Sequence, residues 1–259
     1  MITDTEGIKK LQAAIDESNY IVFFGGAGVS TESGIPDFRS QDGLYNQKYK
    51  YPPEEIVSHT FLVYKQEEFF EFYKDKMLAP DAKPNAAHKK LAEMEASGKL
   101  KAVITQNIDG LHQAAGSKEV LELHGSVLRN YCTKCGKTYS STPDDVNAGV
   151  KYILACDGVP KCNEIVNGKQ CGGVVRPDVV LYEEGLDSDV ISRAIMHISK
   201  ADMLIIGGTS LVVYPAAGFI SYFHGKHLAV LNMASTSRDA QADIIIREKI
   251  GEVFSQIKV

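Results

Sequence analysis

Short, nearly continuous apolar runs recur in both flanks of the chain and predict buried β-strands. They lie at residues 20–24, 102–105, 203–206, 228–231 and 243–246. Such runs are typical of a parallel sheet that is covered on both faces. Helical spacing precedes the first two runs, at Ile8, Leu11, Ala14 and Ile15 and again over 85–96. The alternation predicts an α/β fold with a Rossmann-like, doubly wound parallel sheet.

Two stretches interrupt this alternation of helix and strand patterns. Residues 40–84 are rich in Tyr, Phe, Lys and Glu and predict an inserted helical module, whereas residues 130–175 hold all five cysteines and show little periodicity. We therefore expect a large Rossmann-like part made of about 1–39, 85–129 and 176–259. A smaller inserted part would contain the helical module and the cysteine region.

Composition and charge describe an ordinary globular chain. Of 259 residues, 44% are hydrophobic and 24% are charged, and the net charge is −5, which argues against a broad nucleic-acid or anionic-membrane footprint. No apolar run reaches the roughly 20 residues that span a bilayer, and residues 1–10 lack a signal-peptide pattern. We expect a cytoplasmic location, where cysteines are thiols or metal ligands rather than disulfides.

A glycine-rich turn follows the first predicted strand directly. Gly26 and Gly28 have the spacing of a dinucleotide-binding turn, but Thr31 stands where a third glycine belongs. Small residues let the backbone approach a pyrophosphate, and a following helix would offer unpaired N–H groups to the anion. The turn therefore makes Ala27, Gly28 and Thr31 candidate cofactor residues, although a tight turn without a ligand has the same pattern.

Polar residues follow two further strands. Asn107 and Asp109 come after the strand at 102–105, and His124 stands between an apolar run and Gly125. Polar side chains at strand ends lie at the ligand crevice of an open α/β sheet, and a histidine there can act as a general base. Each also has a structural interpretation, because Asn and Asp favour turns and helix caps and a single histidine is more often a surface or core polar group.

Two cysteines separated by two residues, Cys132 and Cys135, form a knuckle typical of structural zinc. A tetrahedral site requires a second pair, and Cys156, Cys162 and Cys171 are available for it.

Five ordered motifs resemble the sirtuin family of NAD-dependent protein-lysine deacylases. They are SGIPDFR at 33–39, TQNIDGLH at 105–112, LHGS at 123–126, RPDVVLY at 176–182 and GGTSLVVYP at 207–215. The resemblance covers nearly the whole chain. It implies that residues 1–259 form one sirtuin catalytic domain of the short bacterial type, with NAD⁺ as co-substrate.

The resemblance assigns roles at the nicotinamide end of the cofactor. His124 is implied to be the catalytic base, and Gln106 is implied to face the nicotinamide ribose with it. Asn107 is implied to place that ribose and a water, while Ile108 and Asp109 hold the carboxamide of nicotinamide.

Other roles follow in the same way. Phe38 is implied to cover the ribosyl carbon, Asp37 to brace its loop and Arg39 to meet the phosphates. Thr209 and Ser210 resemble the family's second phosphate and ribose site.

The resemblance also implies the two remaining contacts. Asn232 would contact the adenosine ribose, and Ile250 the adenine. The acyl-lysine peptide would lie as an added strand between two walls, whose candidate contacts are Val179, Val180, Tyr182, Val212 and Val213.

By resemblance the second zinc pair is Cys162 and Cys171, because Cys171 opens a Cys-Gly-Gly knuckle. The family spaces this pair closely, whereas eight residues intervene here. Asn167 and Gly168 predict a hairpin tip within the insertion. Cys156 is the alternative third ligand. The implied zinc is one structural ion.

The implied reaction transfers the acyl group of a protein lysine to ADP-ribose and releases nicotinamide. Acetylated proteins are the expected partners, with no direct nucleic acid, no membrane and a monomeric state. A protein mono-ADP-ribosyltransferase and a non-enzymatic sensor of NAD or ADP-ribose are the alternatives. His88 and His112 are expected to pack between helices.

Acyl preference depends on the helical module. Sirtuins that remove succinyl or malonyl groups carry a Tyr-x-x-Arg pair, and here Lys76 stands in place of the Arg, three residues after Tyr73. An ammonium lacks the planar, two-pronged donor that binds a carboxylate. We therefore expect acetyl and other short neutral groups to be preferred, unless the two residues are only a helix face.

Overall fold

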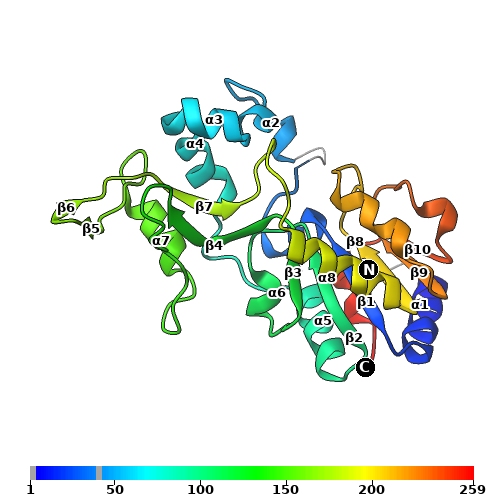
Figure 1. The fold of residues 1–259 in the computed structure, drawn as a ribbon. Helices are drawn as coiled ribbons and strands as arrows, with labels where there is room; N and C mark the ends of the chain where they lie inside the picture. Colours follow the sequence, from blue (N-terminus) through cyan, green and yellow to red (C-terminus); the bar gives the residue numbers. More distant parts are fainter. Residues whose placement is uncertain (1–3, 39–42) are drawn as a thin grey trace.

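The computed structural model describes residues 4–38 and 43–259, and its centre is a six-stranded parallel sheet (Figure 1). The strands are β1 (Ile21–Gly25), β2 (Leu100–Thr105), β3 (Val120–Glu122), β8 (Met203–Gly207), β9 (His227–Leu231) and β10 (Ile244–Ile246). Their order is β10-β9-β8-β1-β2-β3. Counted along the chain, this is the strand order of dinucleotide-binding folds, and it confirms the predicted fold class.

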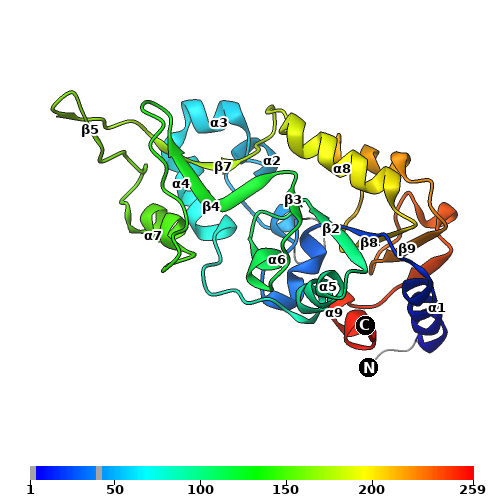
Figure 2. The same cartoon turned by 60° about the horizontal axis from the view of Figure 1, so that its bottom comes forward.

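Helices cover both faces of the sheet, as Figure 2 shows. On one side lie α1 (Thr5–Glu17), α5 (Ala86–Ala96) and α9 (Ile250–Ser255), and on the other lie α8 (Ser188–Lys200) and the 3₁₀ segment η5 (Ala216–Tyr222). Every residue of β1 and β8 is buried, which explains why these strands read as continuous apolar runs. Burying one such large apolar side chain contributes about 1.5–3 kcal/mol.

The order in which the chain adds strands to the sheet reverses between β1 and β8. The turns that follow these two strands meet at this point. The backbone N–H of Gly28 donates to the carbonyl of Gly208 over 2.8 Å. A Cβ on Gly28 would lie 2.8 Å from the Cα of Gly208, so only glycine allows this approach. The prediction of a helix after the first glycine turn is wrong. Two short 3₁₀ segments follow instead, η1 (Ala27–Val29) and η2 (Thr31–Ser33).

The first interruption is the predicted helical module. It consists of η3 (Leu44–Asn46), α2 (Pro53–Ile56), α3 (His59–Tyr64), α4 (Gln66–Phe72) and the π-helix η4 (Tyr73–Met77). Its aromatic residues pack with Val127, Val150 and Val175 in a core separate from those of the sheet.

The second interruption is a ribbon with one helix. An antiparallel pair, β4 (Gly125–Cys132) and β7 (Val175–Val179), forms its base. The hairpin β5 (Ile165–Val166) and β6 (Lys169–Gln170) projects from it (Figure 1), with Asn167 and Gly168 at positive φ in the expected tip. Sequence periodicity missed α7 (Ala148–Ala155). Two short elements complete the fold, α6 (Leu111–Ala114) and η6 (Asp239–Gln241).

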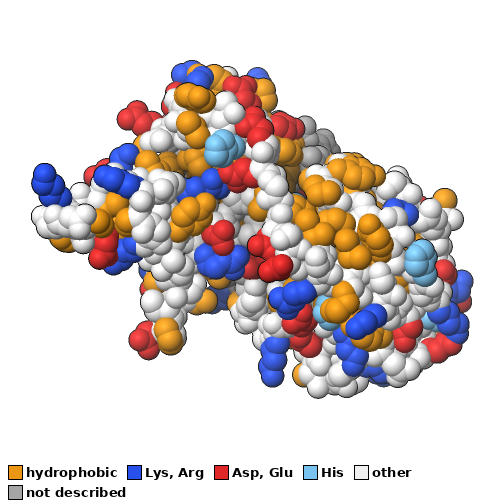
Figure 3. Space-filling view, in the orientation of Figure 1, with side chains coloured by type: hydrophobic (Ala, Val, Ile, Leu, Met, Phe, Trp, Pro, Cys, Tyr) orange, Lys and Arg blue, Asp and Glu red, His pale blue; other side chains and the backbone are white. Residues whose placement is uncertain are grey.

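The visible face carries acidic and basic side chains interspersed rather than a field of one sign (Figure 3). Within residues 4–38 and 43–259, none of the helices combines the length and the apolar character needed to cross a membrane.

Candidate active site

A cavity of about 630 Å³ lies between the carboxyl edge of the sheet and the inserted part. Of the candidate substrate and cofactor residues that the structure describes, only Val212 does not line it. The lining candidates are Ala27, Gly28, Thr31, Asp37, Phe38, Gln106, Asn107, Ile108, Asp109, His124, Val179, Val180, Tyr182, Thr209, Ser210, Val213, Asn232 and Ile250. Arg39 falls outside the described residues.

The turns after β1, β2 and β8 converge on one end of this cavity. The side-chain amide of Gln106 donates to Thr209 Oγ1 over 3.1 Å, so the second and third turns are joined directly. The hydroxyl of Thr31 donates to the carbonyl of Gly28 over 3.0 Å. Small side chains and backbone N–H groups at such a junction suit a pyrophosphate.

Deeper in the cavity, Ser30 joins the two polar residues that follow β2. Its hydroxyl donates to Asp109 Oδ2 over 2.6 Å and accepts from the Asn107 amide over 3.0 Å. Each of these side chains is therefore fixed before any ligand binds. Ser30 was not a candidate in the sequence; its place directly after the glycine turn is the signal that could have found it.

His88 belongs to the same network. Its Nε2 lies 3.5 Å from the Ser30 hydroxyl, and its ring packs edge-on against His112 at 4.7 Å between centroids. Burial lowers the pKa of His88 to about 4, with Asp109 opposing the shift. Burial, helped by the charge of His88, lowers the pKa of His112 to about 3. Both rings are neutral near pH 7, and the expectation that His88 only packs between helices was incomplete.

His124 lies in the turn between β3 and β4 and lines the cavity. Its Nδ1 lies 3.0 Å from the carbonyl of Gln106. A carbonyl only accepts hydrogen bonds, so Nδ1 carries the proton and Nε2 keeps a lone pair. Burial lowers the pKa of His124 below its ordinary value of 6.5, and the hydrogen bond to Gln106 opposes that shift. The arrangement gives a neutral base at pH 7 with one defined tautomer.

Gly125 lets the chain turn beside that histidine. Its φ is +75°, and a Cβ there would lie 2.0 Å from the carbonyl oxygen of Asp178. The carbonyl of His124 accepts from the N–H of Val180 over 3.0 Å. A backbone hydrogen bond therefore joins His124 directly to the segment 179–182, the expected peptide wall.

The segment 179–182 is held in place by the ion pair of Arg176 and Glu184. Glu184 receives a bidentate pair from Arg176 at 2.6 and 3.0 Å and accepts the N–H of Leu181 over 2.9 Å. All four residues of this segment line the cavity. On the opposite wall Val213 lines the cavity, but Val212 is 55% exposed and does not. The contact of Val212 with a peptide stays a prediction.

The residues expected around adenosine follow β9 and begin α9. Asn232 follows β9, and its side-chain amide donates to the carbonyl of Ala234 over 2.8 Å. Ile250 begins α9 and is only 4% exposed. Most of its side chain belongs to the core rather than to the cavity.

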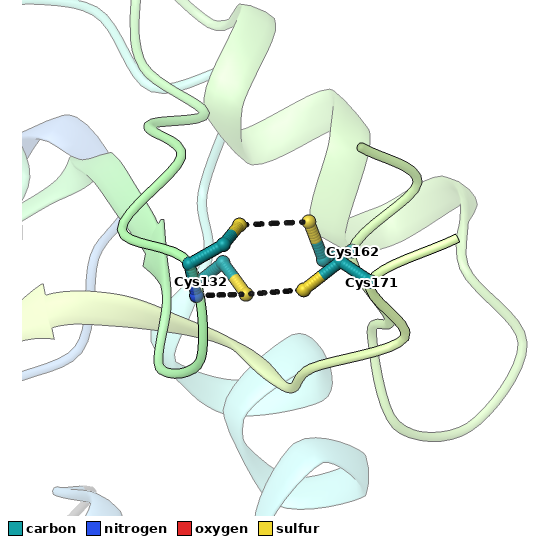
Figure 4. Close-up of side chains that lie close together, drawn as sticks. Cys132, Cys162 and Cys171 are labelled. Carbon is teal, nitrogen blue, oxygen red and sulfur yellow. Dashed lines mark hydrogen bonds between the residues drawn. The ribbon is translucent and has the colours of Figure 1, made fainter. Parts of the chain in front are cut away.

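Four cysteines converge away from this cavity. Cys132, Cys135, Cys162 and Cys171 place their sulfurs within 4.8 Å of one another, and Cys156 lies outside the group. Two sulfur pairs are 3.6 Å apart, Cys132 with Cys171 and Cys135 with Cys162. Figure 4 shows Cys132, Cys162 and Cys171 close together.

These sulfurs fit zinc rather than disulfides. The 3.6 Å separations exceed a disulfide bond of about 2 Å. They are close to the roughly 3.8 Å edge of a tetrahedron with 2.3 Å Zn–S bonds. Backbone N–H groups of Lys134 and Cys135 also point at Cys132 Sγ, at 3.3 and 3.5 Å. The donor set therefore suits one tetrahedral zinc ion, and Cys156 is not needed.

Tyr73 and Lys76 lie in different surroundings. Tyr73 is 2% exposed, and its hydroxyl finds no hydrogen-bond partner within the described parts of the chain. Lys76 lines the cavity but bonds Asp75 at 2.9 Å.

A family model described as the Sir2 family matches residues 26–215. A protein from Clostridium perfringens named NAD-dependent protein deacetylase is 58% identical over 253 residues, covering 96% of this chain and 98% of that protein. A solved Sir2 structure with a deacetylated p53 peptide and 3′-O-acetyl ADP ribose has a TM-score of 0.84 and 38% identity over 96% of both chains. Another, of Sir2 with a p53 peptide and NAD⁺, has a TM-score of 0.80, 38% identity and the same coverage.

Proposed function

The chain belongs to the Sir2 family, and from that premise we propose that it removes acetyl groups from protein lysines with consumption of NAD⁺. One water is consumed as the acyl carbon–nitrogen bond breaks, and the products are nicotinamide, the free lysine and O-acetyl-ADP-ribose. The observation that carries the proposal is the neutral, singly oriented His124, which shares the cavity with the glycine turns and the segment 179–182.

The chain's own residues bind, orient and move one proton. NAD⁺ supplies a ribosyl carbon that the acyl oxygen attacks as nicotinamide leaves. Asn107 and Asp109, fixed through Ser30, hold the nicotinamide end. His124 Nε2 accepts the proton of a ribose hydroxyl, so that its oxygen can attack the acyl carbon. Phe38 keeps bulk water from the ribosyl carbon, and the remaining binding groups orient the phosphates and adenosine.

The structural zinc stabilises the ribbon. Four thiolates close the coordination sphere, so no position remains for a substrate. The closed donor set and its place outside the cavity support a role in folding rather than in the chemistry.

Product analysis tests the proposal against its main alternative. Mass spectrometry of a reaction with acetylated peptide and NAD⁺ should give unmodified lysine and O-acetyl-ADP-ribose. ADP-ribose attached to protein would instead indicate a mono-ADP-ribosyltransferase. Binding of NAD⁺ with no turnover would indicate a sensor.

The acid limb of the activity profile should lie below pH 6.5. A general base acts in its neutral form, so lowering the pKa of His124 by burial extends activity toward lower pH. We expect kcat/KM for the peptide to keep more than half of its maximal value at pH 6.5 and to reach half-loss only below it. Half-loss at or above pH 6.5 in a protein that is still folded by circular dichroism would contradict this assignment.

Acetyl-lysine should be preferred over succinyl-lysine by about tenfold or more. The reason is that Tyr73 and Lys76 do not offer the succinyl carboxylate an oriented pair of charge-assisted hydrogen bonds. The buried Tyr73 and the Lys76–Asp75 ion pair support this expectation. The check is kcat/KM on one peptide with either modification. A preference for succinyl-lysine that Lys76→Ala abolishes would show that Lys76 reads the carboxylate.

We also propose a cytoplasmic location and a monomeric protein without a nucleic-acid partner. Four thiols arranged for metal rather than for disulfides support the location. Light scattering after size exclusion tests the monomer.

The domain division remains part of the proposal. The separate hydrophobic core of the helical module and ribbon supports a small part that is distinct from the sheet.

A further inference from the structure

A pair of tyrosines joins the two substrate regions at the rim of the cavity. The hydroxyls of Tyr45 and Tyr182 are 3.1 Å apart, and one donates to the other, although the residues are 137 positions apart in the chain. Both residues line the cavity. Tyr182 belongs to the wall expected to hold the acyl peptide, and Tyr45 lies close in sequence to Phe38.

The Tyr182 end of this contact is fixed by the backbone. Its N–H donates to the carbonyl of Val57 over 3.1 Å, and its carbonyl accepts from the N–H of His59 over 3.0 Å. The next residue, Glu183, has φ +74° and accepts the N–H of Thr60 over 2.8 Å. The tyrosine ring therefore projects from a segment that is anchored to the helical module.

The Tyr45 end reaches Phe38. The N–H of Tyr45 donates to the carbonyl of Phe38 over 2.8 Å. The two rings pack edge-to-face, with centroids 5.4 Å apart and planes at 65°. Such aromatic pairs have a preferred geometry, so the orientation of the Tyr45 ring limits that of Phe38.

We propose that Tyr45 and Tyr182 are positioning residues that hold Phe38 in register with the acyl-peptide wall and thereby suppress hydrolysis of NAD⁺. The inference rests on the proposed deacetylation and on the role given there to Phe38. The hydroxyl contact links the wall to the ring, so a correctly seated peptide and a shielded ribosyl carbon occur together.

Hydrolysis of NAD⁺ differs from deacetylation in the atom that forms the new bond to the ribosyl carbon. The bond from the ribosyl carbon to nicotinamide breaks with its electron pair leaving on nicotinamide. In deacetylation the acyl oxygen forms the new bond to that carbon. In hydrolysis a water oxygen forms it and releases one proton to solvent, giving ADP-ribose. Each hydrolytic event releases nicotinamide without producing a free lysine.

The test compares nicotinamide released with lysine freed, using acetylated peptide and NAD⁺. Wild-type protein should give a molar ratio near one. Tyr45→Phe and Tyr182→Phe each remove one hydroxyl and keep the ring. Each should raise the excess of nicotinamide over freed lysine by about two- to tenfold, which is the scale of losing one neutral hydrogen bond. The double variant should match the single variants, because all three lack the same contact.

Tyr49→Phe is the matched control. Its hydroxyl donates to Gln47 over 2.9 Å, and Tyr49 is not among the described residues that line the cavity. Its ratio should stay near one. The inference fails if the single variants keep the wild-type excess of nicotinamide over freed lysine, if Tyr49→Phe raises that excess equally, or if the double variant shows the sum of two separate effects. A wild-type protein that frees no lysine would instead overturn the proposed function, and this inference with it.

Discussion

Replacing His124 with alanine should lower the deacetylation rate by about 10²–10⁴-fold, the range for removing a general base. The reason is the defined tautomer of this ring, whose Nδ1 bonds the carbonyl of Gln106 and whose Nε2 is left to accept a proton. NAD⁺ binding should be nearly unchanged, because the converging turns and the Ser30 network do not depend on this side chain. Single-turnover rates and calorimetric NAD⁺ titration measure the two effects separately.

His224→Ala provides the control for that experiment. His224 is exposed and does not line the cavity, so its replacement should leave the rate within a factor of about two. If His124→Ala retains turnover near that of wild type, another residue is the base. If the His124→Ala protein is largely unfolded at the assay temperature, the loss of rate would reflect the loss of the fold rather than of the base.

Cys132→Ala and Cys171→Ala should each reduce zinc from about one ion per chain to near zero and unfold the ribbon. Zinc bound by four thiolates couples its binding free energy, about 10–16 kcal/mol in zinc-finger peptides, to folding. Cys132 and Cys171 are buried in the same core as the helical module. Loss of the metal should therefore also loosen the wall formed by 179–182. Metal analysis and thermal unfolding are the measurements.

Cys156→Ala is the matched control, because its sulfur lies outside the group of four. It bonds the carbonyl of Tyr152 over 3.2 Å, so we expect full zinc and only a small loss of stability. Zinc that is lost from the Cys156 variant but retained in a Cys162→Ala variant would show that the ligand set is wrong.

The sequence allowed prediction of the parts of the fold that depend on local pattern. Strands such as β1 and β8 are buried on both faces, so their apolar runs were unambiguous. The turn of Asn167 and Gly168 requires positive φ at both positions, which these two residue types tolerate. By contrast, α7 is short and lies beside the ribbon strand β4, and tertiary packing rather than periodicity stabilises it.

Site residues were predictable where a residue type and its place after a strand coincide, as at Asn107 and His124. Ser30 and His88 were missed because their role is to orient other side chains across the chain. Tyr45 and Tyr182 meet only through the fold. The choice of Cys162 over Cys156 depended on a family resemblance, since spacing alone left both available.

Peptide-dependent release of nicotinamide tests the central claim most directly. Purified protein is mixed with NAD⁺ and either an acetyl-lysine peptide or the same peptide with unmodified lysine, and nicotinamide and freed lysine are quantified together. The account predicts release with the acetylated peptide only, in near-equal amounts with freed lysine, and almost none from the His124→Ala variant. Equal release with both peptides, or none with either, would contradict it.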